Sequence, residues 1–261
     1  IRVAAATPDI HVADPQYNSE QIIELMEQGS ARGVKVMVFP ELCLTAYTCS
    51  DLFLQETLLK EAKNGLKRIL QSSKSKDMVL LVGMPWMHKG KLYNAAAVVN
   101  RGRILGIVPK KHLPNYSEFY ELRHFTPGME KVEMTEWEGL QIPMGMKLLF
   151  SCRTMPELVL AAELCEDVWV PCPPSISHAL AGATVIANCS ASDETTGKDR
   201  YRYDLICGQS ARLVCGYIYA NAGEGESTQD LVFGGQNIIA ENGTCLVQSD
   251  RFKNACICAD M

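Results

Sequence analysis

The stretch Val159-Leu-Ala-Ala-Glu-Leu-Cys165-Glu-Asp-Val-Trp-Val-Pro171 joins an apolar run of strand length to a cysteine and two acidic residues. Its first six residues predict a buried strand, and the acidic residues after Cys165 predict a turn or the start of a helix. A cysteine at such a strand exit faces a cleft, where backbone N–H groups can hold an oxyanion and a nearby helix N-terminus favours the thiolate. Free cysteines are also common as small buried apolar residues, so this segment alone leaves Cys165 open as a nucleophile or a core residue.

A carboxylate follows a second apolar run, in Val36-Met-Val-Phe-Pro-Glu41. Pro40 fixes the backbone and ends the ladder of hydrogen bonds, so Glu41 lies just past the end of the expected strand. In open α/β sheets such strand ends line the binding crevice. Glu41 could therefore act as the general base for a cysteine, although a lone glutamate can also be a solvated loop residue.

The segment Ile107-Val-Pro-Lys-Lys-His-Leu-Pro114 repeats this arrangement with cations. Side chains alternate along an extended chain, so Lys110 and Lys111 point to opposite faces and only one of them can enter a cleft. A lysine there would stabilise an oxyanion and lower the pKa of a nearby cysteine, whereas two solvated lysines would form an ordinary surface pair. His112 comes closest among the five histidines to a claim as the general base.

The pattern along the rest of the chain predicts an α/β fold in one domain over residues 1–261. Amphipathic spacing predicts helices over 19–32, 52–72 and 199–214. Asn100-Arg101-Gly102 predicts a hairpin, Asn242-Gly243 predicts a turn into a final pair of strands, and 127–144 reads as a surface excursion. Because strands, helices and hairpins are mixed, we expect sheets covered by helices on their outer faces. The ranges expected as strands are 2–6, 34–39, 78–83, 92–100, 103–109, 158–164, 183–187, 216–220, 237–240 and 255–259.

Composition and charge argue against several classes of function. The net charge is −5 without a basic stripe, which argues against a nucleic-acid partner and fits a small uncharged or zwitterionic substrate. No apolar run approaches the length of a membrane span, and the start of the chain lacks the features of a signal peptide. Eleven irregularly spaced cysteines are typical of a reducing cytoplasm rather than of a disulfide framework. The histidines and cysteines lack the spacing of a zinc site, so no metal is expected.

Taken together, the three strand ends resemble the nitrilase, or carbon–nitrogen hydrolase, superfamily. Members carry a Phe-Pro-Glu segment, a Pro-Lys-x-x-Leu-Pro segment and a Cys-Glu-Asp segment, and these match Phe39-Pro-Glu41, Pro109-Lys-Lys-His-Leu-Pro114 and Cys165-Glu-Asp167. The resemblance implies a four-layer αββα sandwich and a catalytic triad of Glu41, Lys110 and Cys165, and it selects Lys110 over Lys111. A fourth family residue, a structural or catalytic glutamate that precedes a Phe-x-Pro-Gly, matches Glu121.

The resemblance is closest to the N-terminal glutaminase domains of glutamine-dependent NAD⁺ synthetases and covers nearly the whole chain. The phrases that carry it run over 39–47, 113–121, 165–174 and 219–227, and the last two are quite specific to that branch. The residues that match glutamine-binding positions of the family are Tyr116, Trp169, Ser192 and Lys198. Relatives can carry Phe and Arg at the second and fourth of these positions, and the two aromatic residues could alternatively serve only in packing. A lysine would pair with the substrate carboxylate as a point charge, where arginine would bind it bidentately.

This resemblance implies hydrolysis of L-glutamine to glutamate and ammonia without a cofactor. A synthetase domain would be the partner that accepts the ammonia and makes NAD⁺ from deamido-NAD⁺ and ATP, and ATP and Mg²⁺ would belong to that domain. Its Ser-Gly-Gly-x-Asp-Ser phosphate loop is absent from this sequence. A homo-oligomer is also expected, because the family forms dimers and larger rings. Two alternatives stay open, namely a free-standing amidase for another small amide and a non-catalytic scaffold domain.

Overall fold

Two β-sheets form the centre of the computed structural model, which describes residues 1–228 and 230–261. Sheet A contains β1 (Arg2–Ala6), β2 (Val36–Val38), β3 (Val79–His88), β4 (Lys91–Asn100), β5 (Arg103–Pro109), β6 (Glu133–Trp137), β7 (Leu140–Met144) and β14 (Cys256–Asp260). Sheet B contains β8 (Phe150–Ser151), β9 (Val159–Leu164), β10 (Val185–Ser190), β11 (Gly216–Asn221), β12 (Ile238–Glu241) and β13 (Thr244–Gln248). The strand orders are β14-β1-β2-β3-β4-β5-β7-β6 in sheet A and β13-β12-β11-β10-β9-β8 in sheet B.

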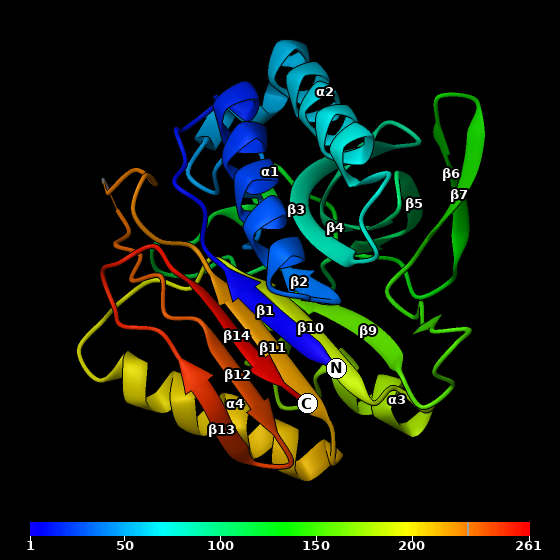
Figure 1. Cartoon of the computed structure of the whole chain (residues 1–261). Helices are drawn as coiled ribbons and strands as arrows, with labels where there is room; N and C mark the ends of the chain where they lie inside the picture. The colour runs from blue at the N-terminus through cyan, green and yellow to red at the C-terminus, as the bar shows by residue number, and fades with distance from the viewer. Residues whose placement is uncertain (229) are drawn as a thin grey trace.

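Helices cover the outer face of each sheet (Figure 1). The helices α1 (Pro15–Ala31) and α2 (Glu56–Ser73) lie on sheet A, and α3 (Pro174–Leu180) and α4 (Lys198–Leu213) lie on sheet B. The structure therefore confirms the four-layer αββα sandwich. None of the helices in the described part of the chain combines the length and the apolar character that crossing a membrane requires.

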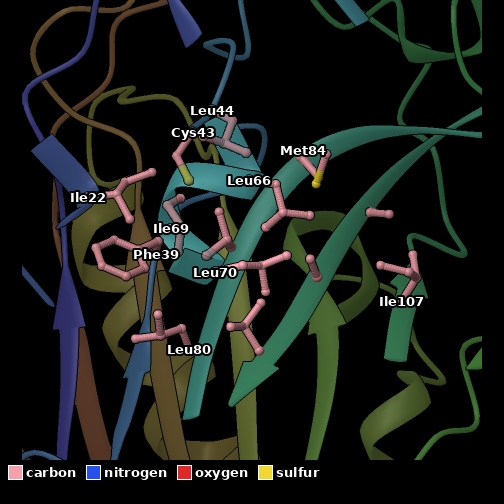
Figure 2. Close-up of a cluster of buried hydrophobic side chains, with 14 of the residues drawn as sticks. Ile22, Phe39, Cys43, Leu44, Leu66, Ile69, Leu70, Leu80, Met84 and Ile107 are labelled. Carbon is pink, nitrogen blue, oxygen red and sulfur yellow. The ribbon is translucent and has the colours of Figure 1, made fainter. Parts of the chain in front are cut away.

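Apolar side chains fill the spaces between the layers. Successive residues of β3 point to opposite faces, so Leu80 packs under the helices while Leu81 enters the space between the sheets. Figure 2 shows the cluster under the helices, where Ile22 of α1 and Leu66 of α2 approach the strands. The cluster between the sheets joins residues of both, including Val36 of sheet A and Ala187 of sheet B.

The first helix begins earlier than the sequence pattern suggested. The expected range was 19–32, but the side chain of Asp14 accepts a hydrogen bond from the backbone N–H of Tyr17 at 3.0 Å and caps the helix ahead of Pro15. The range expected as a second helix, 52–72, is divided. Ser50–Leu54 forms a 3₁₀ turn, and the extended backbone of Gln55 separates this turn from α2.

Two expectations about the strands were wrong. The range 127–144 is not only a surface excursion, because it contains the hairpin of β6 and β7, which extends sheet A. Trp137 of this hairpin stacks on Trp86, with ring centroids 5.6 Å apart, and Met144 is fully buried. The last two strands do not pair with each other either. After the Asn242-Gly243 turn β13 pairs with β12 in sheet B, whereas β14 pairs antiparallel with β1 in sheet A.

Candidate active site

Three strand ends bring the candidate triad together between the two sheets. Glu41 follows β2, Lys110 follows β5 of the same sheet, and Cys165 follows β9 of the other. A hydrogen bond of 3.2 Å from the backbone N–H of Glu41 to the carbonyl of Ser190 joins the two sheets at this point. The three candidate residues therefore lie where the ends of strands from both sheets meet.

Lys110 lies buried between two carboxylates. Its Nζ is 2.6 Å from an oxygen of Glu41 and 2.6 Å from an oxygen of Glu121, and the Lys110 and Glu41 side chains are fully buried. Burial alone would lower the pKa of Lys110, but the charges of Glu121 and Glu41 outweigh it and raise this pKa, so the ammonium stays charged. Burial raises the pKa of Glu121 to about 7, with Lys110 opposing the rise and Glu41 adding to it.

Further hydrogen bonds fix both carboxylates. Asn94 of β4 donates to Glu41 at 2.6 Å, and the backbone N–H of Ala191 donates to the other oxygen of Glu41 at 3.1 Å. The hydroxyl of Tyr47 donates to Glu121 at 2.8 Å. Sequence reasoning missed Asn94 and Tyr47 as site residues. A polar residue inside the otherwise apolar 92–99 run was the available signal for Asn94, because such a residue needs a partner when buried.

Cys165 is 5% exposed and starts the 3₁₀ turn Cys165–Val168. Its φ of +39° lies in the left-handed region, which is unusual for a residue with a side chain. Its backbone N–H donates to the side chain of Asn188 at 3.0 Å. Burial raises the pKa of the Cys165 thiol, the charge of Glu41 raises it further, and Lys110 opposes both. Lys110 lowers the pKa of this thiol as the sequence predicted, but the cost of burying the charge is larger, so the net shift is upward and favours the neutral thiol.

The neighbours of Lys110 take no part in this cluster. Lys111 points the other way and reaches Glu130 at 3.4 Å, with a third of its side chain exposed. The ring and the backbone N–H of His112 both contact Asp167 at 2.9 Å, so this histidine helps to hold the turn after Cys165 rather than serving as its base.

Two glycines allow the loops of the site to approach. A Cβ on Gly83 of β3 would lie 2.3 Å from the carbonyl oxygen of Pro40, so only glycine lets the Glu41 loop rest on this strand. A Cβ on Gly128 would lie 2.9 Å from the carbonyl oxygen of Lys110, which accepts the backbone N–H of Gly128 at 2.7 Å.

The residues expected to bind glutamine lie in a neighbouring group. Lys198 pairs with Asp193, and its Nζ lies 5.4 Å from the ring centre of Trp169 and 5.9 Å from that of Phe119. Tyr116 is half-exposed and packs edge-on against Phe119, with 5.7 Å between the ring centres. Lys198, Trp169 and Tyr116 are thus brought together around Phe119, which sequence reasoning did not single out.

The fourth expected residue is held more tightly. The Ser192 hydroxyl accepts a hydrogen bond of 3.2 Å from buried Arg202, which also bonds the carbonyl of Asp193 at 2.9 Å. Arg202 therefore fixes the loop that carries Asp193, the ion-pair partner of Lys198. A cavity of about 140 Å³ also lies against Tyr47 and Glu121. The described residues hold no group of three or more His, Cys, Asp or Glu side chains placed to bind a metal ion.

Comparisons with known proteins identify the family of this chain. The family model for carbon-nitrogen hydrolase matches residues 2–261. Glutamine-dependent NAD(+) synthetase of Mycobacterium tuberculosis is 42% identical over 252 residues, which are 97% of this chain and 37% of that protein. The protein of the same name from Aquifex aeolicus is 32% identical, over 92% of this chain and 38% of that protein. This chain therefore spans well under half the length of these relatives.

Solved structures show the same fold. A glutamine-dependent NAD(+) synthetase from Cytophaga hutchinsonii superposes with a TM-score of 0.90 and 30% identity, over all of this chain and 43% of that one. An amidase of the nitrilase superfamily from Nesterenkonia superposes with a TM-score of 0.78 over all of this chain and 90% of that one, at 19% identity. Because the family model covers almost every residue, this chain belongs to the carbon-nitrogen hydrolase family.

Proposed function

We propose that this chain hydrolyses the side-chain amide of L-glutamine to glutamate and ammonia through a thioester on Cys165. The observation that carries the proposal is the buried position of Lys110, 2.6 Å from both Glu41 and Glu121 and close enough to Cys165 to affect its pKa. The names of the similar proteins support glutamine as the substrate.

The proposed first half of the reaction forms the thioester. Glu41 takes the proton of the Cys165 thiol, and the sulfur attacks the amide carbon. Lys110 and a backbone N–H hold the oxyanion that develops on the amide oxygen. The N–H of Cys165 itself is bonded to Asn188, so another N–H of this turn must act as the second donor. Protonated Glu41 then gives its proton to the leaving ammonia as the C–N bond breaks.

The second half releases glutamate. Glu41 takes a proton from water, and the resulting hydroxide attacks the thioester carbon. The C–S bond breaks, and the proton returns to the sulfur. Glu121 would orient Lys110 throughout. The reaction needs only water as a co-reactant, so we propose no cofactor for it.

We further propose that the ammonia supplies a synthetase domain, which uses ATP and Mg²⁺ to convert deamido-NAD⁺ to NAD⁺. The names and greater length of the similar proteins support this partner. A homo-oligomer in the cytoplasm completes the proposal, and the eleven free thiols fit a reducing compartment.

The alternatives differ in what they require of the site. An amidase for another small amide would use the same triad. The Nesterenkonia amidase, which shares the fold over 90% of its own chain, favours this second candidate. A scaffold domain would gain nothing from burying a lysine and two glutamates, because taking charges out of water is costly.

Substrate preference and the loss of one thiol test the proposal. Ammonia release should be much faster from L-glutamine than from glutaramate, which lacks the α-amino group. It should disappear in Cys165→Ala and persist in Cys172→Ala, where the altered thiol is exposed. Equal rates on both amides would favour the general amidase, and full activity in Cys165→Ala would refute the mechanism.

A further inference from the structure

A buried row of polar side chains leads away from Cys165 across the outer face of sheet B. Asn188 of β10 contacts Cys165, Tyr217 of β11 contacts Asn188, and Glu163 of β9 contacts Tyr217. The three side chains are at most 1% exposed, and they lie beneath α3 and α4. The proposed reaction uses none of them.

The hydrogen bonds in this row can run in only one direction when Glu163 is ionised, which its pKa of about 7 allows above neutral pH, as at pH 8. One oxygen of Glu163 accepts the hydroxyl proton of Tyr217 at 2.5 Å, and the other accepts the backbone N–H of Ser175 at 2.8 Å. A tyrosine hydroxyl has a single proton, so Tyr217 can then only accept from its second neighbour. The amide nitrogen of Asn188 donates to it at 3.1 Å.

This direction decides which atom of Asn188 faces the nucleophile. With its nitrogen turned to Tyr217, its oxygen accepts the backbone N–H of Cys165 at 3.0 Å and the hydroxyl of Ser190 at 2.9 Å. If the amide were flipped, its NH₂ group would face the N–H of Cys165, donor against donor. The Cys165 backbone, with its φ of +39°, would then lose the bond that holds it in a costly conformation.

We propose that Glu163 is a positioning residue for Cys165, acting through Tyr217 and Asn188. The carboxylate fixes the Tyr217 hydroxyl, the hydroxyl fixes the amide, and the amide holds the turn from which the thiol attacks. The proposal rests on Cys165 being the nucleophile of the proposed function, but it does not depend on which amide is hydrolysed.

Shape-preserving variants test each link. Tyr217→Phe removes the hydroxyl that joins the amide to the carboxylate, and Glu163→Gln replaces one acceptor by a donor. Tyr93→Phe is the matched control, because this tyrosine is also buried but packs in the cluster on the far side of sheet A. The first readout is the rate at which iodoacetamide alkylates Cys165, followed by peptide mass, which needs no knowledge of the substrate. The second is kcat and KM for L-glutamine, with circular dichroism to confirm folding.

The alkylation rate and kcat should fall roughly 10-fold to 100-fold in both variants, the range expected when a buried hydrogen-bonding group loses its partner. KM should not change, because neither residue faces the substrate. The alkylation rate and kcat of the double variant should be no lower than those of the more impaired single variant, because both changes break the same row of bonds. Tyr93→Phe should behave as wild type.

Wild-type alkylation and kcat in either folded variant would overturn the proposal, as would losses that multiply in the double variant. If one variant does not fold, the other decides. Slower alkylation of Cys165 in an enzyme that does not hydrolyse L-glutamine would uphold the proposal while refuting the substrate. Hydrolysis of L-glutamine that is unaffected by both variants would support the substrate and refute the positioning role of Glu163.

Discussion

Replacing Gly83 by alanine should impair the site although it alters no side chain that carries out the chemistry. The added Cβ would lie 2.3 Å from the oxygen of Pro40, 2.4 Å from the nitrogen of Leu42 and 2.8 Å from the carbonyl carbon of Glu41. All three atoms are backbone, so no side chain can rotate to make room. The loop that carries Glu41 must therefore move away from β3 as a unit.

The size of this movement follows from the distances. Restoring the closest contact to about 3.0 Å, near the lower limit of van der Waals contacts, needs a shift of about 0.7 Å. A shift of that size directed away from Lys110 would lengthen its 2.6 Å bond to Glu41 to about 3.3 Å, beyond the normal range of a hydrogen bond. Misplacing a catalytic group by about 1 Å can cost about 100-fold in rate, so we expect activity to fall between about 10-fold and 100-fold. Overpacking should also cost about 1–3 kcal/mol of stability.

Ammonia release and urea denaturation measure the two effects separately. The control is Gly208→Ala in α4, where the added Cβ would meet no heavy atom within 4 Å. That variant should keep full activity, and its free energy of unfolding should rise by up to about 1 kcal/mol, because alanine has a higher helix propensity than glycine. Undiminished activity in folded Gly83→Ala would show that β3 gives way instead of the Glu41 loop, and would refute the reasoning.

Three other changes have defined outcomes. Lys110→Met should abolish ammonia release and lower the free energy of unfolding in urea by about 3–5 kcal/mol, because it leaves two buried carboxylates without their cation. Lys111→Met should change little, and the reverse pattern would show that Lys111 is the catalytic lysine. Since the pKa of Glu121 is raised to about 7, kcat/KM should fall as the pH drops through about 7, and an unchanged acid limb in Glu121→Gln would contradict this assignment. Burial also raises the pKa of Glu163 to about 7, above its usual 4.5, so its contribution to stability is present below about pH 4.5 and is lost as the pH rises through about 7. The cost of Glu163→Gln in urea denaturation should therefore shrink by roughly 3 kcal/mol between low pH and pH 8, and a cost independent of pH would contradict the shift.

The sequence predicted the strands that carry the candidate triad because their signals are local. An apolar run followed by Pro and a charged residue marks both the strand and its end, as at Glu41 and Lys110. Sheet membership is not local, so the pattern did not reveal that β13 and β14 belong to different sheets. It also missed β6 and β7, whose apolar residues become a recognisable buried face only once Trp137 meets Trp86.

The supporting residues of the site were hidden for the same reason. Asn94 reaches the cluster only because β4 lies next to β5, and Tyr47 only because the loop after Glu41 brings its hydroxyl to Glu121. Asn188 is adjacent to Cys165 only through the parallel pairing of β10 with β9. The lowering of the Cys165 pKa by Lys110 was predictable, but the larger upward shift was not, because the cost of burying a charge depends on packing that a single sequence does not display.

The most direct test of the central claim is to trap the intermediate. Wild type mixed with L-glutamine and quenched in acid within its first turnovers should carry one glutamyl group on the peptide that contains Cys165. Hydroxylamine should remove that group, as it does from thioesters, and Cys165→Ala should show neither the adduct nor ammonia release. Glutamine turnover without an adduct on Cys165 in wild type, together with turnover that persists in Cys165→Ala, would contradict the account.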